Sequence, residues 1–418
     1  MGNEIILSLP IYLIGMVSVA ALLFDAFSPK SSRPSLYFAI IGLSLTCAAA
    51  IYSLTIPNSV IDALNPQNTI AKGMIEYGGY SAFFDIIFCI GAIMTLLSSR
   101  RYNTREYGDY KEYYSLILFS VCGMMLISHS NNLLMLFIGV ELMSIPFYIL
   151  AGFFRTKISS VEAALKYFLL GAFATGFLLY GMAMLYGAAG SLNITVIAAK
   201  IKMELVTPIY LIIGFGLIII GLAFKVAAFP FHQWAPDVYH GSPTVVSGFM
   251  SAAGKAAALA AFIIITRAIM PFDIKDPVIL SNSNTARLII ALIAASTMLI
   301  GNITALVQKN VKRMLAYSSV AHAGYLLMGI VAANNRGWSG IIFYASAYTL
   351  MQIGAFVVIS LFERNDGENL EIKDYAGLSK RHPMIAASMA IFMLSLAGIP
   401  PMAGFFGKYY LFAAAVEA

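Results

Sequence analysis

Long apolar segments alternate with short polar connections along the whole chain. About twelve such segments occur, and most are long enough to cross a hydrocarbon core of roughly 30 Å as an α-helix, which takes about 20 residues. Polar residues inside several of them recur at helical spacing. The pattern therefore predicts an all-α, polytopic membrane protein, with helices near residues 5–25, 36–56, 80–99, 114–129, 131–154, 161–189, 207–239, 243–269, 287–308, 314–333, 338–362 and 384–414.

The seventh and twelfth segments, 207–239 and 384–414, contain internal prolines. Pro230 in the seventh, and Pro400 and Pro401 in the twelfth, should break their helices just before the ring. Breaks at membrane depth are tolerated only where backbone lines a cavity or is buried in protein, and paired breaks point to a transport site. Because the breaks lie five helices apart, an odd number, the spacing predicts two five-helix repeats with inverted orientations.

This interpretation divides the chain into three parts. Residues 1–112 form an N-terminal three-helix segment, and residues 113–270 form the first repeat, which contains helices four to eight. Residues 271–418 form the second, inverted repeat, which contains helices nine to twelve.

Composition and charge agree with a membrane protein of defined orientation. Of the residues, 60% are hydrophobic and 11% are charged, against about 25% charged in soluble domains. With the N-terminus outside, fifteen basic residues fall in cytoplasmic loops and seven on the opposite side, as the positive-inside rule requires. The net charge of +6 follows from this topology, and without a basic soluble domain a nucleic-acid partner is not expected. The cytoplasmic set is Lys30, Arg33, Arg100, Arg101, Arg105, Lys111, Arg155, Lys157, Lys309, Lys312, Arg313, Arg364, Lys373, Lys380 and Arg381; the other is Lys72, Lys200, Lys202, Arg267, Lys275, Arg287 and Arg336.

The sequence predicts no cofactor bound by this chain. Cys47, Cys89 and Cys122 lie in apolar segments without CxxC spacing, so they fit neither an iron–sulfur cluster nor a zinc site. No GxGxxG or Walker-type loop is present, which excludes the usual nucleotide sites. Any redox chemistry is expected in a partner. The first apolar segment lacks a basic n-region and a cleavage site, so we expect a retained helix.

Five ionisable residues fall inside the apolar segments: Glu141, Lys166, Lys225, Lys255 and Lys408. Such a charge costs at least about 2.5–3.5 kcal/mol at a helix centre and is a functional-site hypothesis by default. Lys225 would lie at the carbonyl end of a half-helix, where a cation is favoured. Lys166 lies only a turn or two inside its segment, so its ammonium could instead snorkel to the interface.

Other polar residues share helix faces with these charges. A polar face on an apolar helix points into the bundle, where it lines a hydrated proton path or bonds neighbouring helices together. His322 is the candidate relay because histidine titrates near physiological pH; a structural hydrogen-bonding role is the alternative. The faces are Glu141, Ser144 and Tyr148; Ser247, Ser251 and Lys255; Ser318, His322 and Tyr325; and Tyr344, Tyr348 and Gln352.

Four segments resemble a known family: KVAAFPFHQWAPDVYHGSPT, GKAAALA, GNITALVQKNVKRMLAYSSVAHAGYLL and LAGIPPMAGFFGKYYLF. They look like subunit N of the proton-pumping NADH:quinone oxidoreductase (bacterial-type respiratory complex I), an antiporter-like subunit. PDVYHGSPT is the most specific part, since sister subunits L and M and the Mrp antiporters usually read PDA there. The resemblance implies that Glu141 and the four intramembrane lysines transfer protons. It also implies fourteen helices, about two more than are visible here, so the second repeat is expected to be incomplete.

The resemblance also implies the setting of the chain. It would be a proton-translocating, non-redox subunit without an active site of its own, in the bacterial inner membrane with its N-terminus on the periplasmic side. Its partners would be the antiporter-like subunit M, small subunits such as K and J, and lipids. The electron donor (NADH or another), FMN, iron–sulfur clusters and quinone would be bound by partner subunits.

A proton path is the resulting hypothesis. Glu141 would pair with Lys225 and hold it protonated; when the pair loosens, the proton would pass through Lys255 and water to Lys408 and leave on the periplasmic side. Lysine suits a relay because its ammonium can give up a proton, whereas a guanidinium cannot. The main alternative is an Mrp-type Na⁺/H⁺ antiporter subunit, which the same charges would serve. A purely structural scaffold is a third possibility, disfavoured by the cost of five buried charges.

Overall fold

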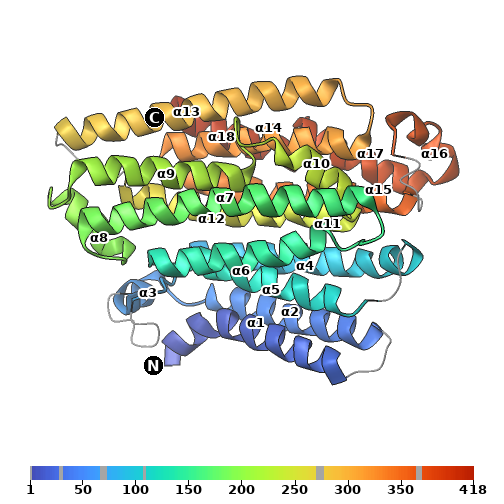
Figure 1. The fold of residues 1–418 in the computed structure, drawn as a ribbon, viewed down its shortest axis with the longest axis horizontal. Helices are drawn as coiled ribbons and strands as arrows, with labels where there is room; N and C mark the ends of the chain where they lie inside the picture. The colour runs from blue at the N-terminus through green and yellow to red at the C-terminus, as the bar shows by residue number, and fades with distance from the viewer. Residues whose placement is uncertain (1, 28–31, 66–72, 107–109, 270–276, 364–369) are drawn as a thin grey trace.

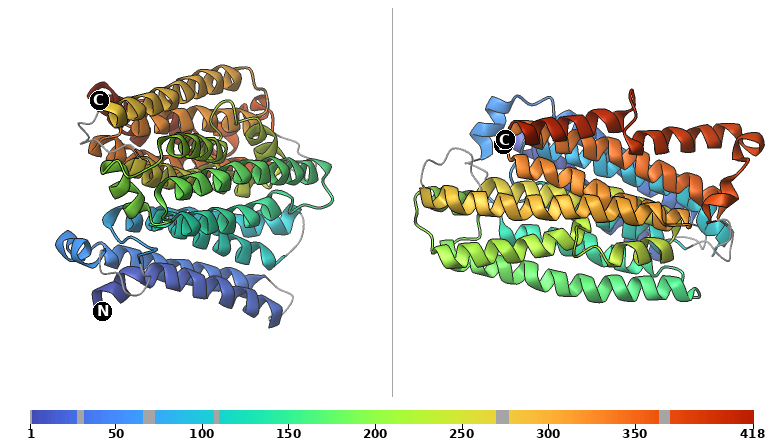
Figure 2. Two further views of the ribbon diagram at one scale, coloured as in Figure 1. Left: turned by 60° about the vertical axis from the view of Figure 1, so that its left-hand side comes forward. Right: turned by 90° about the horizontal axis from the view of Figure 1, so that it is seen from above.

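The computed structural model describes residues 2–27, 32–65, 73–106, 110–269, 277–363 and 370–418, and in these ranges the chain is built from helices without an extended strand (Figure 1). Most helices lie roughly parallel and stack into one elongated bundle (Figures 1 and 2). Ten helices are long and apolar enough to cross a membrane within these ranges. The predicted all-α, multi-pass fold is thereby confirmed.

The N-terminal helices form one side of the bundle (Figure 1). They are α1 (Gly2–Phe27), α2 (Arg33–Ser53), the short α3 (Asn58–Leu64), α4 (Gly79–Glu106), α5 (Glu112–Ser128) and α6 (Leu133–Ala151). The middle of the chain contributes α7 (Ile158–Ala189), α8 (Ile194–Lys202), α9 (Pro208–Val226), α10 (Trp234–Gly241), α11 (Thr244–Phe249), a π-helical segment (Met250–Gly254) and α12 (Lys255–Ile269). The last third forms α13 (Pro277–Leu306), α14 (Val311–Ala332), α15 (Asn335–Phe362), a 3-10 turn (Ile372–Tyr375), α16 (Leu378–Arg381), α17 (Pro383–Ala397) and α18 (Ala403–Val416).

All twelve predicted segments lie on helices, and both predicted breaks are present. The seventh segment divides into α9 and α10, and the twelfth divides into α17 and α18. The first break begins at Ala227, three residues before Pro230, because Ala227 adopts a positive φ of 58° and ends α9 in the left-handed conformation. Gly398, with φ of 84°, ends α17 in the same way.

Several parts of the sequence interpretation stay predictions. The boundary between the two repeats at residues 270–271 and the basic residues Lys30, Lys72, Lys275 and Arg364 lie outside the described residues. The inverted orientation of the repeats likewise remains a prediction.

The run from α11 through α12 lies at the centre of the bundle. In Thr244–Ile269, 94% of the most apolar window is buried inside the chain, against 22% in α13. Outer helices instead expose large apolar side chains such as Phe173 on α7 and Leu299 on α13. Such apolar exterior surface fits contact with lipid, and the central run is therefore shielded from it.

Close helix contacts fix the position of α9, which carries Lys225. A methyl group added at Gly181 of α7 would lie 2.7 Å from the carbonyl oxygen of Gly214 on α9, and one at Gly214 would lie 2.9 Å from that of Gly181. Such approach is possible only with small residues at the crossing. The pair therefore sets the distance between α7 and α9.

Candidate functional site

Lys225 lies buried in the last turn of α9, next to the first break. Its ammonium donates to the Ser144 hydroxyl at 2.7 Å and to the Tyr148 hydroxyl at 3.3 Å, both on α6. It also lies 5.7 Å from the centroid of the Tyr148 ring. The Phe224 oxygen at this helix end accepts from the Ala227 amide and also from the Trp234 indole, each at 3.0 Å. The sequence prediction that this lysine lies at an opened helix end is confirmed.

The expected direct pair between Glu141 and Lys225 is not formed. No carboxylate lies within 4.0 Å of the Lys225 ammonium among the described residues, and Glu141 Oε1 is buried without a hydrogen-bond partner there. Ser144, one turn further along the same face of α6, takes the ammonium instead. Glu141 therefore lies one helical turn from the residue that binds Lys225, without contacting the ammonium itself.

Lys255 is 1% exposed and begins α12 directly after the π-helical segment. Its ammonium donates to the hydroxyl and to the backbone carbonyl of Ser319 on α14, both at 2.6 Å. The sequence analysis placed Ser318 on this face, but Ser319 is the buried residue that makes the contact. π-Helical turns are often found at functional sites, and here the turn precedes the most buried lysine of the central run.

His322 connects Lys255 with the second break. It lies one turn beyond Ser319 on α14, and its Nδ1 is hydrogen-bonded to the Tyr344 hydroxyl of α15 at 2.5 Å. Its ring centroid lies 5.6 Å from that of Tyr325. The ammonium of Lys408 on α18 lies 4.8 Å from the centroid of the same Tyr325 ring.

Lys408 is held by the second break itself. Its ammonium donates to the carbonyl oxygens of Leu396 at 2.8 Å and of Ala397 at 3.2 Å, which the end of α17 leaves free. Helix C-termini favour cations in this way. Lys225, Lys255 and Lys408 thus all bind neutral oxygens. Ser319, His322 and Tyr325 link Lys255 with Lys408, and α9, which carries Lys225, packs against α12. We call Lys225, Lys255, His322 and Lys408 the row.

Lys166 does not belong to this row. Its side chain is 39% exposed, and its ammonium lies 2.7 Å from a carboxylate oxygen of Glu162 and 2.7 Å from one of Asp237. The second oxygen of Asp237 binds Arg313 at 2.9 Å. The snorkelling alternative describes its position better than the buried one.

A buried ion pair escaped the sequence analysis. Lys312, counted there as a loop residue, is 2% exposed in the first turn of α14, and its ammonium lies 3.7 Å from the carboxylate of Glu363 at the end of α15. Glu363 also accepts hydrogen bonds from Tyr102 at 2.9 Å and from Thr244. A basic residue in a first helical turn is unfavourable without a partner, and that signal could have indicated the pair.

A second buried pair joins His129, at the end of α5, with Asp85 on α4. His129 Nε2 lies 2.8 Å from Asp85 Oδ2, and Ser128 donates to the other oxygen at 3.2 Å. The sequence analysis assigned His129 no role because its turn gives no indication of a partner 44 residues earlier. Asp85 lies near the start of α4, whereas Tyr102, which contacts Glu363, lies near the end of that helix. The two buried pairs therefore lie near opposite ends of α4.

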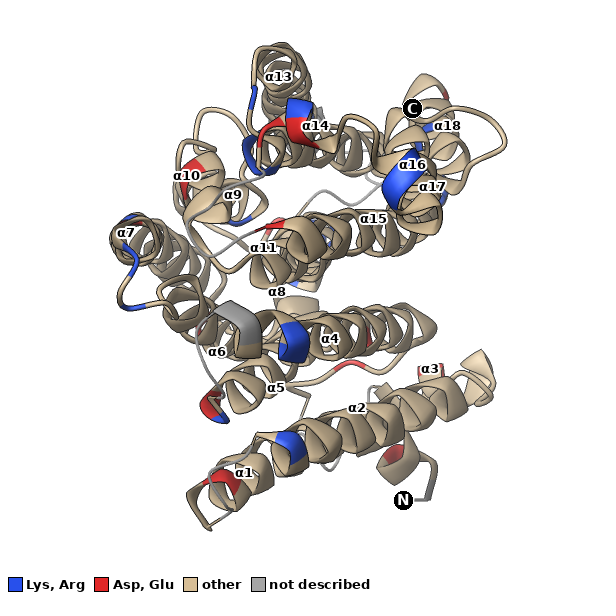
Figure 3. Cartoon of the chain, turned by 90° about the vertical axis from the view of Figure 1, so that its right-hand side faces the viewer, with Lys and Arg blue, Asp and Glu red and all other residues tan. Residues whose placement is uncertain are grey.

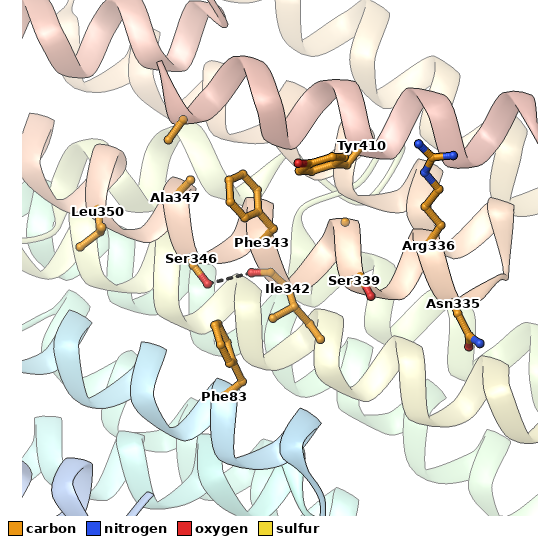
Figure 4. Close-up of a pocket in the computed structure, with 12 residues that line it drawn as sticks. Phe83, Asn335, Arg336, Ser339, Ile342, Phe343, Ser346, Ala347, Leu350 and Tyr410 are labelled. Atoms are coloured by element: carbon orange, nitrogen blue, oxygen red, sulfur yellow. Dashed lines mark hydrogen bonds between the residues drawn. The ribbon is translucent and has the colours of Figure 1, made fainter. Parts of the chain in front are cut away.

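Within the described ranges, neither a metal-binding group nor a further cavity adds to this row. The cysteines Cys47, Cys89 and Cys122 are free, and no group of three His, Cys, Asp or Glu side chains comes together that could hold a metal ion among the residues described. A cavity of about 900 Å³ runs along the outer face of α15 between Phe83 and Tyr410 (Figure 4). Its lining includes none of the ionisable residues of the row.

Comparison with known proteins places this arrangement in a family. Residues 130–418, more than half of the chain, match the model of the NADH:quinone oxidoreductase/Mrp antiporter transmembrane family. NADH-quinone oxidoreductase subunit N 1 of Chloroherpeton thalassium is 44% identical over 98% of this chain and 82% of its own length. The chain belongs to the subunit N branch of this family.

Solved structures agree with the family assignment. A chain of respiratory complex I from Thermus thermophilus, determined with bound aureothin, is 33% identical, with a TM-score of 0.79 over 98% of this chain and 83% of that one. A chain of the Mrp complex from Dietzia sp. DQ12-45-1b has a TM-score of 0.83 over 100% of this chain and 75% of that one, but only 22% identity. The Mrp likeness therefore concerns the fold.

The structure explains the segment that carries the subunit N resemblance. In KVAAFPFHQWAPDVYHGSPT, Lys225 lies in the last turn of α9, and Asp237 binds Lys166 and Arg313. Thr244 begins α11 and donates to Glu363. Tyr239 is buried against Trp234 with ring centroids 5.5 Å apart. This segment thus supplies contacts on both sides of the break, at the end of α9 and at the start of α11.

Proposed function

We propose that this chain is a proton-translocating membrane-arm subunit of an NADH:quinone oxidoreductase, coupling quinone reduction elsewhere in the complex to proton transfer across the membrane. The observation that carries the proposal is the row of Lys225, Lys255 and Lys408, whose ammonium groups bind only neutral oxygens among the described residues. A buried cation without a counter-ion is expensive, so each lysine can give up its proton readily and take one back.

Transfer proceeds along the row as the local charge changes. With Glu141 ionised, its field favours a proton on Lys225; when that field weakens, Lys225 releases the proton toward Lys255. The Ser319 hydroxyl and His322 continue the path on α14, and Lys408 receives the proton beside Tyr325. Moving one charge against 100 mV requires about 2.3 kcal/mol, and quinone reduction in the partner subunits supplies this energy.

The charge distribution supports the orientation given to this path. Figure 3 looks onto one end of the bundle, where coloured charged segments mark the loops and helix ends while the helix bodies are mostly tan. By the positive-inside rule this is the cytoplasmic end. The N-terminus then lies on the periplasmic side of a bacterial inner membrane, and Lys408 releases protons to that side.

The partners and cofactors follow from the same proposal. The chain contacts the antiporter-like subunit M, small subunits such as K and J, and lipids. NADH or another electron donor, FMN, iron–sulfur clusters and quinone are bound by other subunits. Co-purification of iron–sulfur subunits with this chain in mild detergent separates this function from that of an Mrp-type antiporter subunit.

Lys225→Ala in the assembled complex tests the proposal. The variant complex, reconstituted into vesicles, should oxidise NADH but pump fewer protons per electron. The matched control is Lys202→Ala, which removes an exposed lysine at the end of α8. A normal proton-to-electron ratio in Lys225→Ala, with normal assembly, would overturn the proposal.

A further inference from the structure

We propose that Glu363, with its partner Lys312, is the cytoplasmic proton inlet of this chain and delivers protons to Lys255 along one face of α11 and the π-helical segment. The inference rests on the proposed proton-translocating function and adds to it an entry site and a route. Both come from contacts at one end of the bundle.

The inlet is built from four elements that meet at that end. Tyr102 lies in the last two turns of α4, Thr244 is the first residue of α11, Lys312 lies in the first turn of α14, and Glu363 follows the last residue of α15. All four are at most 6% exposed. The Glu363 carboxylate accepts from Tyr102 and Thr244 through one oxygen and faces Lys312 through the other.

The buried pair lies directly beside charged residues that reach the surface. Arg313 follows Lys312 on α14, is 33% exposed and binds Asp237, which is 36% exposed. The Lys312 ammonium donates to the Ser242 carbonyl at 3.0 Å, at the end of the short helix that carries Asp237. The buried Lys312 thus contacts Glu363 and the end of the helix that carries the half-exposed Asp237.

A hydroxyl-lined helix face leads from Glu363 to Lys255. Thr244, Ser247, Ser251 and Lys255 follow one another at intervals of three, four and four residues, which places them on one face. All are at most 1% exposed. Successive positions on such a face have Cβ atoms about 5–6 Å apart, a gap that one bridging water spans. The whole face covers twelve residues, 244–255, and includes the π-helical segment.

Contacts from α15 extend this face. The Gln352 amide donates to the Ser251 hydroxyl at 3.3 Å, while its own Oε1 is buried without a partner among the described residues. A buried amide oxygen without a partner costs free energy, and a water on the path would satisfy it. Ser251, which Gln352 contacts, lies one turn before Lys255, where the proton must arrive.

The proton balance of the route is simple. The Glu363 carboxylate takes a proton from cytoplasmic water, and the Thr244 hydroxyl accepts it while releasing its own proton toward Ser247. Water and the Ser251 hydroxyl pass it to the Lys255 amine, which becomes an ammonium. No bond other than O–H and N–H changes, and Glu363 returns to the carboxylate that pairs with Lys312.

A purely structural ion pair is distinguished from an inlet by a double variant. Glu363→Gln alone leaves Lys312 buried and unpaired, which is destabilising by itself. Glu363→Gln combined with Lys312→Met removes both charges, and replacing a whole buried pair is often neutral for stability. If the pair only holds helices together, the double variant should therefore behave as the wild type does.

The experiment measures protons per electron and NADH oxidation in the reconstituted complex. We expect the double variant to assemble and to lose as much pumping as Lys225→Ala. The single variant Glu363→Asp, which keeps a carboxylate beside Lys312, should retain part of the pumping. Glu371→Gln, which removes an exposed glutamate of the following turn, should pump normally. Wild-type stoichiometry in the assembled double variant would overturn the inlet, whereas wild-type stoichiometry in Lys225→Ala would overturn the proposed function itself.

Thr244→Val gives a second, independent readout if the double variant does not assemble. It removes the hydroxyl that bonds Glu363 and keeps the side-chain shape. We expect lower proton stoichiometry with unchanged assembly. Unchanged stoichiometry in this variant would also overturn the route.

Discussion

Lys255 donates to both the hydroxyl and the backbone carbonyl of Ser319, each at 2.6 Å. One ammonium thereby joins the central helix run to α14, the helix that also carries His322. Because both acceptors are neutral, the contact persists whether the lysine is an ammonium or, as an amine, donates with a remaining N–H. Lys255 can therefore gain or lose a proton without losing its contact with Ser319.

Lys255→Met should abolish pumping through this chain while leaving the complex assembled. Methionine keeps the length of the side chain and removes the costly buried cation. Ser319→Ala should have a smaller effect, since the carbonyl acceptor stays. The measurement is the proton-to-electron ratio in vesicles, with Ser346→Ala as the control because that hydroxyl bonds only its own helix, at the Ile342 carbonyl. Full pumping by Lys255→Met would remove Lys255 from the path.

Lys166→Ala should change stability little, because exposed ion pairs contribute little to it. Lys166 is 39% exposed and Asp237 keeps its second partner, Arg313, in this variant. Asp237→Ala releases both cations and should destabilise the chain more. Thermal unfolding in detergent compares the two, and the pumping ratio tests their role. A loss of pumping by Lys166→Ala as large as that of Lys225→Ala would restore Lys166 to the path.

The sequence was sufficient to predict the helices and their breaks, since hydropathy and length dominate in lipid. Proline alone was not a sufficient signal, however. Pro10 and Pro146 lie inside continuous helices, α1 and α6. The break before Pro230 begins at Ala227, and the break before Pro400 begins after Gly398; each of these residues has a positive φ. The two breaks are therefore distinguished by a residue with positive φ at the end of the helix. For Ala227 the residue type does not predict that conformation.

Side-chain partners were much less predictable than helices. The pairing of Glu141 with Lys225 followed from opposite charge, but Ser144 on the same helix face reaches the ammonium first. Glu363 and Lys312 are 51 positions apart and flank helix ends that look like loops in the sequence. Both errors have the same cause. Sequence periodicity predicts which residues share one face of a helix, but the way two helices cross decides which turns of those faces meet.

Acid should weaken the contribution of Glu363 to stability. Burial by itself would raise the pKa of this carboxyl, but the Lys312 charge and the hydrogen bonds from Thr244 and Tyr102 bring the pKa below its ordinary value. A lowered carboxyl pKa gives stability that is complete above the unfolded-state value of about 4.3 and is lost as the pH falls through the folded value. The midpoint of thermal unfolding should therefore differ most between wild type and Glu363→Gln near neutral pH.

The same difference should shrink as the pH drops below about 4, because the wild-type carboxyl then becomes neutral as well. Glu371→Gln serves as the control, since this side chain is 49% exposed and should give a small difference at every pH. A difference between wild type and Glu363→Gln that stays constant from neutral to acid pH would contradict an ionised Glu363.

Tyr344→Phe should lower pumping less than Lys255→Met does. The substitution removes the hydroxyl bonded to His322 Nδ1 but leaves the imidazole, its tilted contact with the Tyr348 ring and the aromatic volume. The ring then loses the contact that fixes its tautomer and orientation. Protons per electron, compared with those of His322→Gln, measure the effect. Equal and complete loss in both variants would show that the hydroxyl itself carries the proton.

Gly404→Ala should disturb the second break and, through it, Lys408. A methyl group at Gly404 would lie 1.8 Å from the Ser395 carbonyl oxygen, and the Gly404 amide donates to the Ser395 hydroxyl at 3.2 Å. Since backbone occupies the space, α17 and α18 must separate, at a cost of about 1–3 kcal/mol. Gly216→Ala on α9, where a methyl group meets nothing within 4 Å, is the control. α17 supplies the carbonyls that hold Lys408. Gly404→Ala should therefore lower both the unfolding temperature and the proton-to-electron ratio. Full pumping despite a lower unfolding temperature would show that Lys408 does not depend on the contact between α17 and α18.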